Sequence, residues 1–113
     1  MRWHIVAALF VVCFSATAQA ATLTGWVSDE SCGAVHIKPG QESCVEKCLR
    51  GGASVGHPEW LPQRMVLVSD DGETIWLIEN PNALKSQAGR HVIIKATLHS
   101  RSNSIRVMGL QSQ

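Results

Sequence analysis

An apolar stretch near the N-terminus of the 113-residue chain limits how much of the sequence is left to fold. Arg2 lies in a short polar start, an apolar run covers residues 5–14, and Ala18-Gln19-Ala20 offers small residues for cleavage. This arrangement is typical of a secretory signal peptide. The run is about half as long as a bilayer-spanning helix, so we expect no membrane span. We predict a signal peptide at residues 1–20, one domain at residues 21–113, and a periplasmic or secreted location.

Loss of the leader changes the composition of the mature domain. Both phenylalanines and Trp3 leave with it, and the chain has no tyrosine, so the mature aromatic residues are Trp26, Trp60 and Trp76. The whole chain carries 10 Lys and Arg against 9 Asp and Glu, and removing Arg2 balances the two. A balanced surface with few aromatic rings lacks the features that bind nucleic acid. We therefore predict that no nucleic acid is a partner; the protein or small-molecule partner is not identified by the sequence.

The second half of the chain alternates apolar and polar residues with the two-residue period of β-strands. Asp70-Asp71-Gly72 is a hairpin signal between two such runs. We predict strands at residues 22–28, 64–69, 73–78, 90–99 and 105–109. We predict a short helix at residues 42–50, which Gly51-Gly52 ends, and a helical turn at residues 80–89. This order predicts a mostly β fold, a small five-stranded OB-like barrel with one cysteine-bearing helix after the first strand and a helical turn before the fourth.

Two sequence segments carry a resemblance to a known group of proteins. Residues 25–33 read GWVSDESCG, His36 follows, and residues 44–48 read CVEKC. This resembles small exported bacterial OB-fold-like domains of uncharacterised function with the pattern G-x-V-x-D-x-x-C-G, a histidine, and C-x-x-x-C. Residues 88–98, AGRHVIIKATL, look like the glycine-started fourth strand of many bacterial OB-like domains. The resemblance implies the fold and a marked cysteine and histidine constellation, but it implies no activity.

The three mature cysteines lie close together in the sequence and share their segment with a histidine. Cys32, His36, Cys44 and Cys48 are spaced C-x3-H-x7-C-x3-C, and the last two lie one helical turn apart. Such a set could form a tetrahedral centre for zinc, or for Cu(I), which favours thiolates. Asp29 could orient the histidine or the metal from the second coordination shell.

A disulfide is the alternative interpretation of the same cysteines. In an exported protein two of three thiols commonly pair, and a bond between Cys32 and Cys44 would stabilise the fold by about 3 kcal/mol. Cys48 would then be a buried free thiol in an interaction or ligand-binding domain without metal. An enzyme is the third interpretation. It is the weakest, because the C-x-x-C and G-x-S-x-G motifs are both absent from the sequence.

The segment between the predicted helix and the second strand is expected to be a surface loop, because residues 53–63 contain two prolines. Within it, Trp60-Leu61 either covers the mouth of the barrel or contacts a partner. His57 is either a further metal ligand or a solvent-exposed residue.

Overall fold

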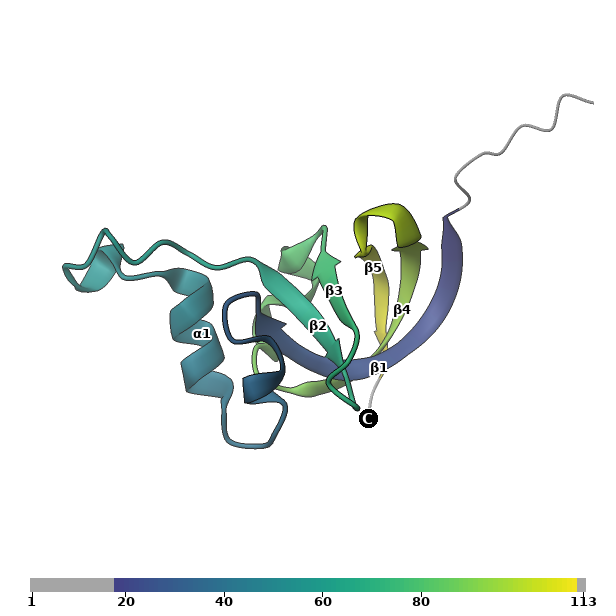
Figure 1. Ribbon diagram of the computed structural model, residues 1–113, viewed down its shortest axis with the longest axis horizontal. Coiled ribbons are helices and arrows are strands. Elements are labelled where there is room, and N and C mark those ends of the chain that lie inside the picture. Colours follow the sequence, from purple (N-terminus) through teal and green to yellow (C-terminus); the bar gives the residue numbers. More distant parts are fainter. Residues whose placement is uncertain (1–17, 112–113) are drawn as a thin grey trace, which may run out of the picture.

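The structure is a computed structural model that describes residues 18–111, and it is mostly β (Figure 1). Its strands and α-helix are β1 (Gln19–Asp29), α1 (Glu42–Arg50), β2 (Met65–Ser69), β3 (Ile75–Ile78), β4 (His91–His99) and β5 (Ser104–Gln111). Short 3-10 helices connect them: η1 (Gly33–His36), η2 (Ala53–Val55), η3 (Pro81–Gln87) and η4 (Ser100–Ser102). The mostly β class, the five strands, the bounds of the cysteine-bearing helix and the helical turn before the fourth strand are confirmed.

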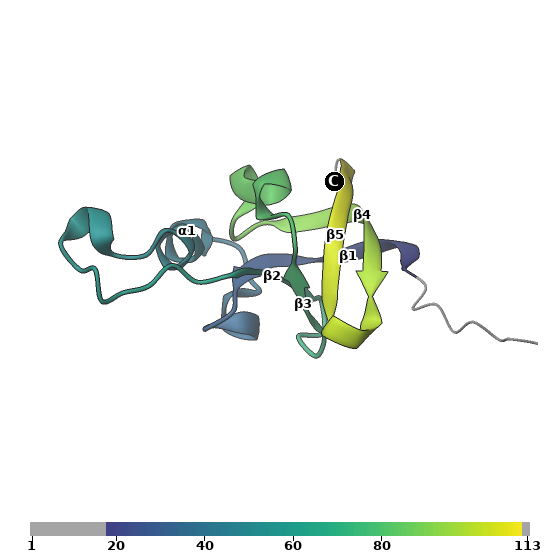
Figure 2. The ribbon, with the colours of Figure 1, turned by 90° about the horizontal axis from the view of Figure 1, so that it is seen from above.

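The five strands close into a barrel in the order β1-β2-β3-β5-β4. Figure 2 shows the same barrel from above. β1 is long enough to pair with two neighbours. Its first part pairs with β4, from Gln19 opposite Leu98, and its last part pairs with β2, ending with Asp29 opposite Met65. All the pairs are antiparallel except β3 with β5, which is parallel. β1 therefore joins both edges of the sheet, and its C-terminal end emerges beside the start of β2.

All five strands differ from the predicted ranges at one end or both, and the largest differences at a strand start are in β1 and β3. β1 begins at Gln19 rather than Thr22, so the first two residues of the strand belong to the predicted leader, whose residues 1–17 lie outside the described part. β3 begins at Ile75 rather than Glu73. The hairpin turn takes up the missing residues, because Asp71 Oδ1 accepts the Glu73 N–H at 2.9 Å and Ser69 Oγ accepts the Thr74 N–H at 3.0 Å. Side-chain acceptors near the turn thus replace the strand pairing that alternation alone would predict.

The barrel interior is filled by aliphatic side chains that alternate along the strands. Leu84 contributes from η3, so the helical turn before β4 is packed into the same core as the strands. The core cluster comprises Val27, Met65, Leu67, Ile78, Leu84, Val92, Ile94, Ala96, Ile105 and Val107. Within residues 18–111, no helix is long and apolar enough to cross a membrane.

Glu79 links three parts of the barrel rim, and it predicts an effect of pH on stability. Its carboxylate accepts hydrogen bonds from the His99 ring and, at 3.0 Å, from Ser104 Oγ, and these bonds lower the pKa of Glu79. A carboxyl group with a lowered pKa in the fold stabilises it above the unfolded pKa and loses that effect as pH falls. Glu79→Gln should therefore lower the melting temperature slightly at pH 7, and the difference should shrink as the pH falls below about 4.5, the ordinary pKa of a glutamate. Thermal melts across pH test this, with the exposed Glu73→Gln as the matched control.

Candidate metal centre

Three side chains with metal-ligating atoms come together where β1 ends. Asp29 is the last residue of β1, Cys32 lies at the start of η1, and His36 is the last residue of η1. One ligand atom from each lies within 4.8 Å of the others. The tight 3-10 turn makes this possible, because it folds the chain back beside the strand end within a few residues.

The Asp29 carboxylate is completely buried and only half satisfied. Its Oδ2 accepts hydrogen bonds from Ser31 Oγ at 2.6 Å and from the Cys32 N–H at 3.1 Å. Its Oδ1 has no hydrogen-bond partner. Among residues 18–111, no lysine or arginine forms an ion pair with this carboxylate. Burying a carboxylate oxygen that has no hydrogen-bond partner costs free energy, so a cation beside Oδ1 would stabilise the fold.

The His36 ring presents a nitrogen to that oxygen. His36 Nδ1 lies 3.1 Å from Gln41 Oε1, an amide oxygen that accepts hydrogen bonds, so this contact favours the tautomer in which Nδ1–H donates a hydrogen bond to it. In the neutral ring the lone pair is then on Nε2, which lies 3.9 Å from Asp29 Oδ1. This separation is too long for a hydrogen bond. Two electron-pair donors therefore face each other across a gap, and a cation between them would satisfy both.

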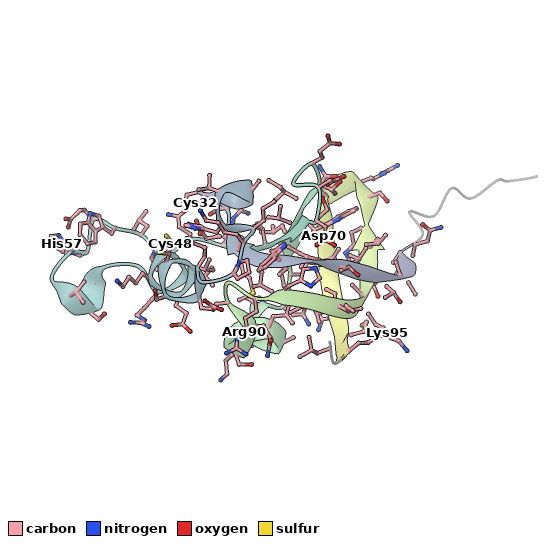
Figure 3. All side chains as sticks on the ribbon, turned by 90° about the horizontal axis from the view of Figure 1, so that it is seen from below. Cys32, Cys48, His57, Asp70, Arg90 and Lys95 are labelled. Carbon is pink, nitrogen blue, oxygen red and sulfur yellow. The ribbon has the colours of Figure 1, made fainter. Side chains whose placement is uncertain are left out.

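Cys48 brings a second thiol to the same place from α1. Burial raises the pKa of the Cys48 thiol, and the Asp29 carboxylate and the Cys32 thiol raise this pKa further. In Figure 3, Cys32 and Cys48 lie where α1 meets the end of β1. Cys32, Cys44 and Cys48 are all free thiols, and no disulfide joins these three described cysteines. The surroundings of Cys48 thus disfavour a bare thiolate and favour either a proton or a metal ion on its sulfur.

The structure distributes the predicted site residues unequally. It brings Cys32 and His36 together, and it places Cys48 against Cys32. Asp29 was predicted to act only from the second coordination shell, but one of its carboxylate oxygens lies among the possible ligand atoms. Cys44 and Cys48 both lie outside the group of three; Cys44 is exposed to solvent, whereas Cys48 is partly buried and interacts with Cys32 and Asp29.

The loop residues take no part in this group. His57 Nδ1 is 2.9 Å from Glu59 Oε1, and the His57 ring stacks on Trp60. Figure 1 shows the loop on the side of α1 away from the barrel. The suggestion that Trp60-Leu61 covers the barrel mouth is therefore wrong, because α1 stands between the loop and the barrel.

The donor atoms are spaced almost closely enough for a tetrahedral ion. Ligand atoms around tetrahedral zinc stand about 3.3 to 3.8 Å apart, as follows from the zinc bond lengths. The gap of 3.9 Å between Asp29 Oδ1 and His36 Nε2 is just above that range. All the ligand atoms lie within 4.8 Å of one another, so binding to one ion needs a contraction of at most about 1 Å, which a side-chain rotation can supply.

Comparisons of the chain with protein-family models, with curated proteins and with solved structures found no significant match.

The different surroundings of the two helix cysteines predict different reactivity. The thiolate is the reactive form, so the raised pKa of Cys48 slows its alkylation at neutral pH. Cys44, which is exposed, should react with iodoacetamide at least about ten times faster in the metal-free protein. Raising the pH above 9 should narrow the difference. Peptide mapping by mass spectrometry after timed alkylation measures both rates, and equal rates at pH 7 would contradict the assignment of environments.

Proposed function

We propose that this protein is an exported, non-enzymatic binding module that holds a transition-metal ion at Asp29, Cys32, His36 and Cys48. The ion that best fits these residues is zinc. The proposal departs from the set predicted by spacing in one respect, since Asp29 takes the place of Cys44 as a direct ligand. Cys44 remains on the exposed face of α1, one turn away.

We also propose that the barrel is of the OB type. The strand order β1-β2-β3-β5-β4 supports this, together with the parallel pair β3 and β5 and the helical turn before β4. In this proposal the barrel serves as a rigid support for the site. The end of its longest strand fixes Asp29, and a donor held on a strand end is positioned more precisely than one on a free loop.

The unpartnered Asp29 Oδ1 is the observation that carries the metal proposal. It is fully buried, and it faces the Nε2 lone pair of His36, whose other nitrogen is held by Gln41. A hydrogen-bond acceptor on the second nitrogen is the usual way in which proteins orient a metal-binding histidine. Cys32 and Cys48 add thiol sulfur on the same side. A divalent cation would neutralise this group of potentially anionic ligands.

Zinc fits this set better than Cu(I). Zinc is commonly bound by combinations of thiolate, imidazole and carboxylate in tetrahedral sites. Cu(I) favours soft thiolate and thioether donors, and a buried carboxylate is a hard one. A Cu(I) centre would be better served by Cys32, Cys44 and Cys48 together, which would require Cys44 to turn inward.

Titration of the reduced, metal-free mature protein with Co²⁺ tests the proposal. Co²⁺ takes tetrahedral zinc sites, and thiolate ligands give it intense absorption that water or carboxylate ligands do not. We expect one equivalent to bind, with sulfur-to-cobalt charge-transfer bands, and zinc to displace it. The Cys48→Ser variant should lose part of the charge-transfer intensity, while Cys44→Ser should keep all of it. A titration without charge-transfer bands would refute a thiolate metal centre here.

A disulfide-stapled domain without metal is the second candidate, and one observation favours a particular pairing. The Cys32 thiol raises the pKa of the Cys48 thiol, and it does so more than Cys44 does. Oxidation would therefore join Cys32 to Cys48 and link η1 to α1. Mass mapping of the protein from the periplasm distinguishes the two candidates, because this disulfide would remove two of the proposed zinc ligands.

A further inference from the structure

A cavity of about 720 Å³ lies between the second half of α1 and the loop that follows it. The loop spans residues 51–64, and Figure 1 shows that it extends away from the barrel beyond α1. Cys48 and Ser31 line the cavity at its inner end, and the remaining lining residues come from α1 and the loop. The volume is within the range of sites that hold small organic molecules, about 300 to 1,000 Å³.

The loop that walls this cavity has a fixed conformation. The Gly52 N–H donates to the Trp60 carbonyl at 2.8 Å, the His57 N–H donates to the Gly52 carbonyl at 2.8 Å, and the Gln63 N–H donates to the Cys48 carbonyl at 2.9 Å. A Cβ atom on Gly52 would lie 2.6 Å from the His57 carbonyl oxygen, and Gly51 has a φ of +75°. The chain can therefore pass this closely only with glycine at both positions. The loop that walls the cavity is held by these hydrogen bonds, so the cavity is preformed and not a space within a flexible segment.

Three large apolar side chains on this loop are exposed. Val55 is 67% exposed, Trp60 is 55% exposed and Leu61 is 70% exposed, and all three line the cavity. The Trp60 ring is held in place by stacking on His57, with ring centroids 3.7 Å apart and planes 11° apart. Clustered apolar residues on an ordered surface loop commonly mark a binding site.

Two cations lie among the polar residues of the lining. Lys47 and Arg50 line the cavity from α1, and neither forms an ion pair with any residue in the described range 18–111. The lining contains one carboxylate, Glu59, and this group is engaged by His57 at 2.9 Å. The cavity therefore combines an apolar wall with free positive charge at its helical side.

We propose that this cavity binds a monomeric amphipathic carboxylate, with its carboxylate at Lys47 and Arg50 and its apolar chain against Val55, Trp60 and Leu61. The charge of the lining selects an anion, and the exposed apolar wall selects a chain or ring attached to it. The proposal stands apart from the metal centre, because Asp29, Cys32 and His36 do not line the cavity. Cys48 borders both sites.

Calorimetric titration of the whole mature protein with decanoate, below its micelle concentration, tests this proposal. We expect one saturable site, and binding of decanol and decylammonium at least about tenfold weaker, the factor expected for loss of a charge-assisted contact. Lys47→Gln and Arg50→Gln should each weaken decanoate binding by about tenfold or less. Trp60→Ala should weaken it by at least about tenfold, since it removes most of the apolar wall. Lys95→Gln is the matched control, because Lys95 is an exposed cation on the barrel, away from the cavity (Figure 3).

Several outcomes would overturn the proposal. Absence of decanoate binding would do so, and so would equal binding of decanol, which would show that the charge plays no part. An equal loss in Lys95→Gln would show a general charge effect. Binding of the protein to phosphatidylglycerol vesicles without binding of monomeric decanoate would identify the loop as a membrane contact instead.

Circular dichroism of each variant confirms that it is folded. Gly52→Ala, which disturbs the loop alone, should abolish decanoate binding while the barrel still melts cooperatively.

Discussion

Replacement of Cys32 by serine is expected to lower the affinity for zinc by at least about 100-fold. Loss of a residue that only hydrogen-bonds to a metal ligand already lowers metal affinity by up to about this factor, and Cys32 is a proposed ligand itself. Cys32 lies at the centre of the cluster, since it shares a group of donor atoms with Asp29 and His36 and raises the pKa of the Cys48 thiol. Serine keeps the size and the backbone hydrogen bond to Asp29 but removes the thiolate that zinc prefers. Competition against a chromophoric chelator of known affinity measures the change.

The same substitution at Cys44 is the matched control. Cys44 is exposed and lies outside the group of donor atoms, so Cys44→Ser should change the zinc affinity by less than about threefold. A loss as large as that of Cys32→Ser would return Cys44 to the ligand set that the sequence spacing predicts. A loss in neither variant would mean that zinc binds elsewhere.

Replacement of Ile94 by alanine is expected to destabilise the barrel by about 3 kcal/mol, within the usual range for truncating a buried isoleucine. Ile94 is fully buried in the core cluster and lies on β4, which pairs with both β1 and β5. The strands around it cannot move inward without breaking their pairing, so the cavity stays open. A domain of this size is stable by a narrow margin, and such a loss could unfold a large part of the population.

Ile93→Ala is the control for this prediction, because the same residue type is truncated one position away on the same strand. Ile93 points to the outer face of the barrel and is only partly buried. Urea unfolding followed by circular dichroism should show a loss of less than about 1 kcal/mol for Ile93→Ala. Equal losses at the two positions would contradict the register of β4.

The sequence predicted the fold well where a single periodicity decides the structure. The alternation along β4 reflects a strand with one buried face, and the Gly51-Gly52 pair ends α1 as expected. The boundaries were less predictable. Two turn residues, Glu73 and Thr74, have strand-like sequence but bond to Asp71 and Ser69 instead. Local side-chain acceptors compete with strand pairing in a way that periodicity does not record.

The candidate site was only partly predictable, for a related reason. Spacing along a helix places Cys44 and Cys48 on one side, but it does not say which of them meets the strand end. The sequence signal for Cys48 was its position beside Leu49 and three residues after Val45, on the apolar stripe that packs inward. The sequence marked Asp29 only as a supporting residue, with no sign that one of its oxygens would lie among the donor atoms. Its unpartnered oxygen depends on the end of β1 meeting η1, a tertiary contact that no local pattern encodes.

Elemental analysis with thiol counting, on anaerobically purified protein that lacks the predicted leader, tests the proposed metal centre most directly. We expect one zinc ion per chain, one thiol, Cys44, that reacts at once, and two more thiols, Cys32 and Cys48, that react only after chelation. A protein that contains no metal, and that shows a single reactive thiol even when denatured with chelator, would contradict the metal centre and establish a disulfide in its place.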